Sequence, residues 1–131
     1  MSMTLKYIAC AAVLTWSTIL LASLIRARMW TPEGMRIGFG NREDLPPATG
    51  LAGRADRTAR NTLENFVLFA ALALAAQVAG ANAAQTEMGA AIFFWSRLAY
   101  VPVYLLGIAY LRTAIWLVSL YGLWLILKGL L

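Results

Sequence analysis

Histidine is missing from this chain of 131 residues, and cysteine occurs only once, as Cys10. Without histidine, a histidine-based zinc site and a Ser-His-Asp catalytic triad are excluded. A single cysteine also excludes an intramolecular disulfide. Charge is scarce as well, because only 13% of the residues are charged, against about 25% in an ordinary soluble domain. The sequence therefore lacks both the common catalytic residues and the surface of a soluble protein.

Long apolar runs dominate what is present, since 61% of the residues are hydrophobic and the mean hydropathy is +0.69. The first run, Tyr7 to Ile25, has nineteen uncharged residues, enough for a helix to cross a bilayer core of about 30 Å. No small-residue cleavage site precedes Arg26, so this run is interpreted as an anchor rather than a signal peptide. The sequence predicts one all-α membrane domain, a four-helix antiparallel bundle, with spans at about 7–25, 61–82, 88–110 and 113–130.

The basic residues indicate how these spans are oriented. Most of them lie between the first two apolar runs, as Arg26, Arg28, Arg36, Arg42, Arg54, Arg57 and Arg60. The positive-inside rule then places the loop at about 26–56 in the cytoplasm and both termini outside. Because the basic residues are not interleaved with exposed aromatics, no nucleic-acid partner is expected. Membrane lipids are the partners expected for these residues. Many glycines and prolines argue against a long regular element in this loop.

A polar stripe leads into the second span, where R-T-A-R-N-T-L-E-N occupies residues 57–65. Arg57, Arg60, Asn61 and Glu64 are spaced i, i+3, i+4 and i+7, so on a helix they share an arc of roughly 100°. Charge at the start of a span is costly unless it meets a polar partner. The stripe therefore predicts a polar contact on one face of this helix.

A second polar group interrupts the third span, in R-L-A-Y-V-P-V-Y at residues 97–104. Arg97, Tyr100 and Tyr104 again follow one helical face, and Arg112 comes near a hairpin expected at Leu111 to Thr113. Neighbouring antiparallel spans bring both polar groups to the cytoplasmic side. The sequence predicts a cleft with four arginines against one carboxylate, which suits a small anionic ligand.

Simpler interpretations remain open for the same residues. Arg57 and Arg60 are also typical interfacial anchors, and asparagines often bond neighbouring membrane helices. A purely structural ion pair between Arg97 and Glu64 is a further alternative. Cys10 is expected to serve packing, and four aromatic residues are expected to face lipid or the interface: Tyr110, Trp116, Tyr121 and Trp124.

These motifs, together with L-R-T-A-I-W at residues 111–116, resemble the MAPEG family, the membrane-associated proteins of eicosanoid and glutathione metabolism, and most of all its bacterial branch. The resemblance covers nearly the whole chain. It implies a homotrimer that binds glutathione as cosubstrate between subunits near the cytoplasmic face. By position, the glutathione-binding residues would be Arg57, Arg60, Asn61 and Glu64 from the second span and Arg97, Tyr100 and Tyr104 from the third.

The resemblance also implies a catalytic role for Arg112, which would stabilise the glutathione thiolate. Trp116 stands where some members have a second arginine, so prostaglandin-isomerase chemistry is not expected. The leading hypothesis is a transferase or peroxidase of the bacterial inner membrane that acts on hydrophobic electrophiles or lipid hydroperoxides. The alternatives are a non-catalytic lipid-binding or scaffold member of the family, and a small four-helix transporter.

Overall fold

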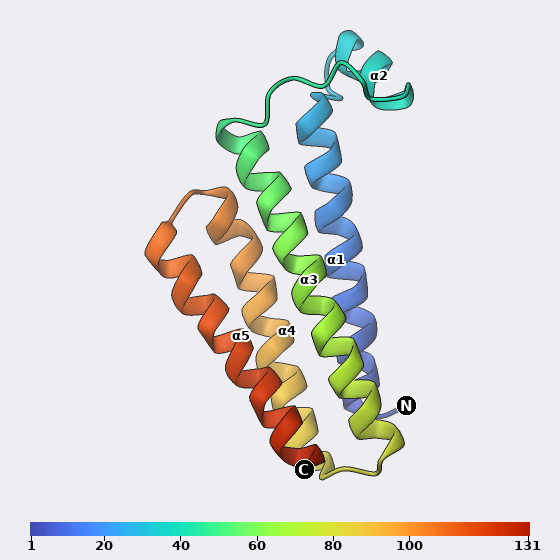
Figure 1. Cartoon of the computed structure of the whole chain (residues 1–131), viewed down its shortest axis with the longest axis vertical. Coiled ribbons are helices and arrows are strands. Elements are labelled where there is room, and N and C mark those ends of the chain that lie inside the picture. Colours follow the sequence, from blue (N-terminus) through green and yellow to red (C-terminus); the bar gives the residue numbers. More distant parts are fainter.

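The computed structural model describes all residues 1–131 and contains five helices and no strand. Four of them are long and apolar enough to cross a membrane: α1 (Met3–Ala27), α3 (Gly50–Val78), α4 (Ala83–Leu105) and α5 (Ala109–Leu130). Spanning helices that follow one another in the sequence run antiparallel, with both termini at one end of the bundle (Figure 1). The predicted all-α, four-span membrane protein is confirmed.

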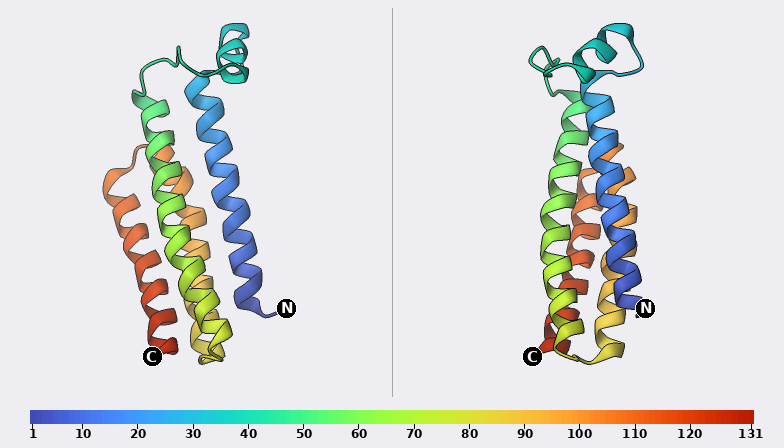
Figure 2. Two further views of the ribbon diagram at one scale, coloured as in Figure 1. Left: turned by 45° about the vertical axis from the view of Figure 1, so that its right-hand side comes forward. Right: turned by 90° about the vertical axis from the view of Figure 1, so that its right-hand side faces the viewer.

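Both α3 and α4 pack against each of the other three spanning helices, whereas α1 and α5 do not touch (Figure 2). Stacked rings of Phe69 and Phe93, with centroids 4.2 Å apart, join α3 to α4 in the core. Small residues such as Ala73 and Ala90 complete this core and let the backbones approach closely.

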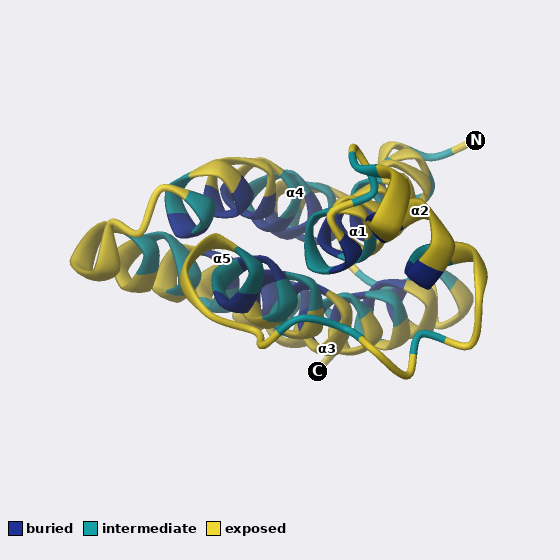
Figure 3. Cartoon of the chain, turned by 90° about the horizontal axis from the view of Figure 1, so that it is seen from above, coloured by how far each residue is buried: buried dark blue, intermediate teal, exposed yellow.

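The buried faces of the helices point inward and the exposed faces point outward (Figure 3). Many of the exposed residues are large and apolar; Val13 and Leu68, for example, are more than half exposed. Such a surface is unfavourable in water and suits the hydrocarbon of a bilayer. The chain is therefore a multi-pass membrane protein.

A tight hairpin joins α4 to α5, and its position differs from the predicted one. The turn lies at Leu106 to Ile108, not at Leu111 to Thr113, and Gly107 supplies a left-handed φ of +79° there. Consequently Arg112 belongs to the first turns of α5, and its backbone N–H donates to the Ile108 carbonyl.

The segment between α1 and α3 is also more ordered than its glycines and prolines suggest. It contains a short helix, α2 (Pro32–Phe39), which Thr31 caps through its side-chain oxygen. In addition, α3 begins at Gly50, so the last seven residues of the expected loop are helical. The "arginine-rich end" of the bundle denotes the end that carries α2, the start of α3 and the α4–α5 turn (Figure 1).

Candidate functional site

A buried arginine lies at the centre of the polar residues. The side chain of Arg97 in α4 is only 1% exposed, and its Nη2 donates to Asn61 Oδ1 at 2.8 Å and to Thr62 Oγ1 at 3.1 Å. The other two guanidinium nitrogens, Nε and Nη1, have no hydrogen-bond partner. No carboxylate lies within ion-pair distance, so the suggested pair with Glu64 is absent. Burying an unpaired charge is costly, which marks this part of the bundle as specialised.

Two tyrosines of α4 form an aromatic surface for the surrounding arginines. Tyr100 and Tyr104 are buried and meet edge to face, with ring centroids 5.5 Å apart. The Arg97 guanidinium lies 4.1 Å from the Tyr100 ring centroid, and the Arg112 guanidinium lies 4.2 Å from that of Tyr104. Ring faces attract cations without neutralising them. The positive charge of both arginines therefore stays without a carboxylate partner.

Arg57 ties the start of α3 to this aromatic surface. Its Nε donates to the Tyr104 hydroxyl over 3.1 Å, so one tyrosine contacts a guanidinium of α3 with its hydroxyl and a guanidinium of α5 with its ring. Tyr104 thereby fixes the relative positions of Arg57 and Arg112. The polar stripe and the second polar group are thus brought together in one chain.

Arg54 supports the site and was not among the predicted residues. Its Nε donates to the Leu105 carbonyl at the end of α4, over 2.9 Å. This bond satisfies a carbonyl that the helix itself leaves unpaired, and a cation is favourable at a helix C-terminus. Arg54 thereby fastens α3 to the turn that positions Arg112. Its spacing of i−3 from Arg57 was the only signal in the sequence.

A cavity of about 220 Å³ opens beside these side chains. Its wall consists of Asn61, Tyr100, Arg112, Thr113 and Trp116. We call this the Arg112 cavity. No carboxylate lines it, so its potential is positive, and hydroxyl and amide groups add hydrogen-bonding capacity. Trp116, expected to face lipid, instead forms part of this wall, and its buried indole Nε1 has no hydrogen-bond partner.

Two of the predicted residues do not join this group within one chain. Arg60 and Glu64 are both exposed and form no ion pair. Their positions follow from the rotation of α3, whose inner face is formed by Thr58, Thr62 and Asn65. Arg60 lines a different cavity, on the α1 side of α3. The remaining six predicted residues lie together.

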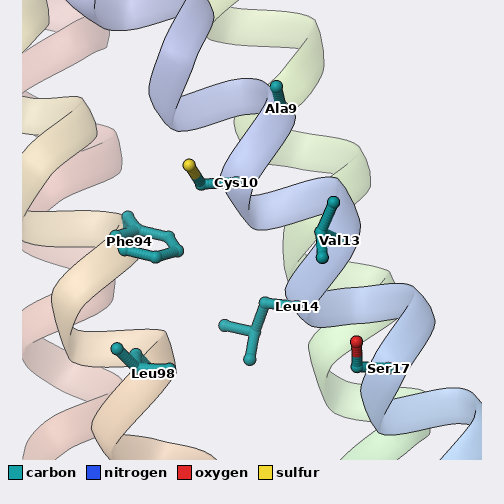
Figure 4. A pocket seen from close by; sticks show the side chains of 7 residues that line it. All are labelled: Ala9, Cys10, Val13, Leu14, Ser17, Phe94 and Leu98. Atoms are coloured by element: carbon teal, nitrogen blue, oxygen red, sulfur yellow. The ribbon is translucent and has the colours of Figure 1, made fainter.

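A larger groove of about 480 Å³ lies between α1 and α4 and is almost wholly apolar. Cys10 and Leu14 of α1 face Phe94 and Leu98 of α4 across it (Figure 4). The exposed Cys10 thiol and the Ser17 hydroxyl are its only polar side-chain groups. Because it contains no charge, this groove cannot hold a small anion. The Arg112 cavity is the better candidate for binding a polar ligand.

Comparison with known proteins agrees with the motifs and the four-span architecture. The model of the MAPEG family matches residues 3–131, which is essentially the whole chain. Searches of curated proteins and of solved structures return no match. The matched range includes every residue of the Arg112 cavity as well as Arg57, Arg97 and Tyr104. The chain therefore belongs to the MAPEG family.

Proposed function

We propose that this protein is a membrane glutathione transferase or peroxidase in which Arg112 stabilises the glutathione thiolate. The family includes enzymes of both kinds, and its members generally use glutathione. The observation that carries the proposal is the position of Arg112, whose guanidinium lies over the Tyr104 ring beside a cavity that contains no carboxylate. A cation next to a thiol lowers the thiol pKa and raises the thiolate fraction.

The residues around the cavity fit glutathione chemically. This tripeptide carries two carboxylates, one amino group and two amide bonds. Arg57 is positioned to bind a carboxylate, because guanidinium groups match carboxylate geometry and only its Nε is engaged, with Tyr104. Asn61 supplies an amide at the cavity wall, and the Tyr100 hydroxyl supplies a further polar group. The buried charge of Arg97 adds to the positive potential at this site.

In the reaction we propose, Arg112 holds the negative charge on sulfur until the second substrate arrives. The sulfur then bonds to an electrophilic carbon, and the leaving group departs with its electron pair. With a lipid hydroperoxide, the sulfur instead bonds to the terminal oxygen as the O–O bond breaks, and the lipid alkoxide leaves and takes up a proton. A second glutathione then displaces water from the resulting glutathione sulfenic acid, which gives glutathione disulfide. Tyr110 and Leu111, beside Arg112, are exposed and give a hydrophobic substrate a route from the bilayer.

A second copy of the chain would complete the site. The cavity of about 220 Å³ is smaller than the roughly 300–1,000 Å³ typical of small-molecule pockets. Glu64, a member of the predicted stripe, is exposed, so its carboxylate can reach the amino group of glutathione bound at a subunit boundary. We therefore propose the homotrimer typical of the family. The glutathione contact expected of Arg60 stays a prediction from the resemblance; within one chain this side chain lines the cavity on the α1 side.

The distribution of charge supports a proposed orientation as well. The arginine-rich end would face the cytoplasm of a bacterial inner membrane, following the positive-inside rule. Glutathione would then enter from the cytoplasm and the second substrate from the bilayer.

The test is ultraviolet difference absorbance of the glutathione thiolate on purified protein in nanodiscs. Wild type should show a thiolate signal. Arg112→Ala should bind glutathione but lose the signal, whereas Arg57→Ala should weaken binding while the bound fraction still ionises. Arg36→Gln provides the control, because Arg36 is exposed on α2 and pairs only with Glu33. Glutathione bound by wild type only as the thiol would refute catalysis and favour a non-catalytic binding protein.

A further inference from the structure

A second arginine-lined cavity lies on the opposite side of α3, between that helix, α1 and the segment that follows α2. Its volume is about 450 Å³, and Arg26, Arg42 and Arg60 contribute to its wall. We call this the Arg42 cavity. It shares no lining residue with the Arg112 cavity.

The charges around this cavity do not balance. Three guanidinium groups face a single carboxylate, that of Asp56. Arg26 Nε donates to Asp56 Oδ2 over 3.2 Å, while Arg26 Nη1 is buried without a hydrogen-bond partner. Arg60 forms no ion pair. Donors therefore remain for an anion.

The cavity is held in shape by the chain itself. Arg42 has a left-handed φ of +59°, and its guanidinium donates to the Ser23 carbonyl of α1 over 3.2 Å and to the Gly38 carbonyl over 3.3 Å. These bonds fix the segment after α2 across the end of α1. A ligand that enters does not have to order this segment first, which favours affinity.

Part of the wall is apolar and extends deeper into the bundle. Ile19 and Ala22 of α1 precede Arg26 by seven and four residues, so they lie up to about 10 Å further along the helix axis. Leu45 and Ala59 add to the apolar part. The cavity thus has the charges of Arg26 and Arg42 at the arginine-rich end and apolar surface that extends toward the membrane core at Ile19. An amphipathic anion matches this arrangement.

We propose that the Arg42 cavity binds the phosphate head group of an anionic phospholipid, with the first part of the acyl chain against Ile19. Basic pockets between membrane helices bind such head groups, and guanidinium groups bind phosphate through paired, charge-assisted hydrogen bonds. A free phosphate ion would use only the charged part of the wall. The apolar part therefore assigns the ligand to a lipid.

The experiment titrates phosphatidylglycerol into the detergent-solubilised full chain and follows the melting temperature. Phosphatidylcholine and inorganic phosphate are titrated separately. Phosphatidylcholine has acyl chains but no net charge, and phosphate has charge but no acyl chain, so the two contributions are measured independently. The variants are Arg42→Gln and Arg60→Gln. Arg28→Gln is the matched control, because Arg28 is exposed at the end of α1, outside the cavity, and its replacement changes the net charge equally.

Wild type and Arg28→Gln should be stabilised by phosphatidylglycerol with the same apparent affinity, and neither of the other two ligands should match it. Each cavity variant should bind phosphatidylglycerol about five-fold more weakly, as expected for one arginine near anionic lipid. Equal affinities in all variants would overturn the proposal. An equal effect of inorganic phosphate would overturn the assignment to a lipid. Neither result affects the thiolate measurement, so the two proposals fail separately.

Discussion

Two groups of arginines flank α3 near the same end of the bundle, and they differ in what surrounds each guanidinium. On the α4 and α5 side, Arg97 and Arg112 lie over tyrosine rings, and no carboxylate is near. On the α1 side, Arg26 bonds to a carboxylate and Arg42 to backbone carbonyls, beside apolar side chains.

This difference shows how one residue type serves two kinds of ligand. Aromatic faces hold a guanidinium in place and leave its charge unneutralised. Such a site suits a small polar anion whose reactive atom must become negative. A guanidinium beside a carboxylate and an apolar wall keeps less net charge and gains affinity for amphipathic molecules. The partners of each arginine, more than its depth in the membrane, therefore distinguish the two cavities.

The largest effect should come from a substitution in the contact between α4 and α5, the two helices that supply most of the Arg112 cavity. In the α4–α5 contact, a Cβ on Gly122 would lie 2.7 Å from the Gly89 carbonyl oxygen and 2.8 Å from the Phe93 backbone nitrogen. Gly122→Ala must therefore push α5 away from α4. We expect a loss of about 2–3 kcal/mol in the free energy of unfolding and loss of the glutathione thiolate signal. Phosphatidylglycerol affinity should persist, because the Arg42 cavity involves neither α4 nor α5.

The control for this prediction is Gly129→Ala on the same helix. A Cβ there would meet its nearest neighbour at an ordinary 3.5 Å, so the free energy of unfolding should change little or rise slightly. Chemical unfolding in detergent, together with the two ligand assays, measures both variants. Simultaneous loss of both ligands in Gly122→Ala would mean that the cavities are not independent.

A smaller effect should separate the two roles of Tyr104. Tyr104→Phe removes the hydroxyl that accepts from Arg57 but keeps the ring under Arg112. Glutathione should bind about five-fold more weakly, as expected for one lost hydrogen bond, and the bound glutathione should still ionise. Tyr104→Leu removes the ring too and should also lower the thiolate fraction. Equal thiolate fractions in Phe and Leu variants would show that the ring does not position Arg112.

The sequence predicted the four spans and much of the candidate site for one physical reason. Hydropathy determines where helices cross and therefore that neighbours are antiparallel. Two polar stripes at matching depths on adjacent helices then have to meet, and Asn61 does meet Arg97, as Arg57 meets Tyr104. Depth along the membrane is thus readable from the sequence.

The rotation of each helix was less readable. Four polar residues of α3 share an arc, but the sequence does not say which edge of that arc faces α4. The inner face is defined by Thr58 and Thr62, whose small size permits close packing although they are polar. As a result Arg60 lines the α1 side and Glu64 is exposed.

The structure differs from the sequence-based prediction at two further places, the hairpin between α4 and α5 and the side chain of Trp116. Charge usually marks a turn between spans, so Arg112 suggested a hairpin at Leu111 to Thr113. The actual turn contains apolar residues around Gly107, and this glycine was the only residue in the sequence that indicated a turn there. Similarly, an aromatic residue near a helix end suggests the lipid interface, whereas Trp116 lines a polar cavity.

The smallest effect is expected for a substitution in the Arg42 cavity, at its single carboxylate. Asp56→Asn breaks the bond to Arg26, whose side chain is 19% exposed against 36% for Asp56. Because such partly exposed pairs contribute little, we expect the free energy of unfolding to fall by about 1 kcal/mol or less. The same substitution removes the only carboxylate of the cavity, so phosphatidylglycerol should bind up to about five-fold more tightly.

Glu33→Gln on α2 removes the other ion pair of the chain, outside the cavity, and should leave lipid affinity unchanged. Weaker lipid binding in Asp56→Asn would mean that the bond to Asp56 positions Arg26 for the lipid and does not compete with it.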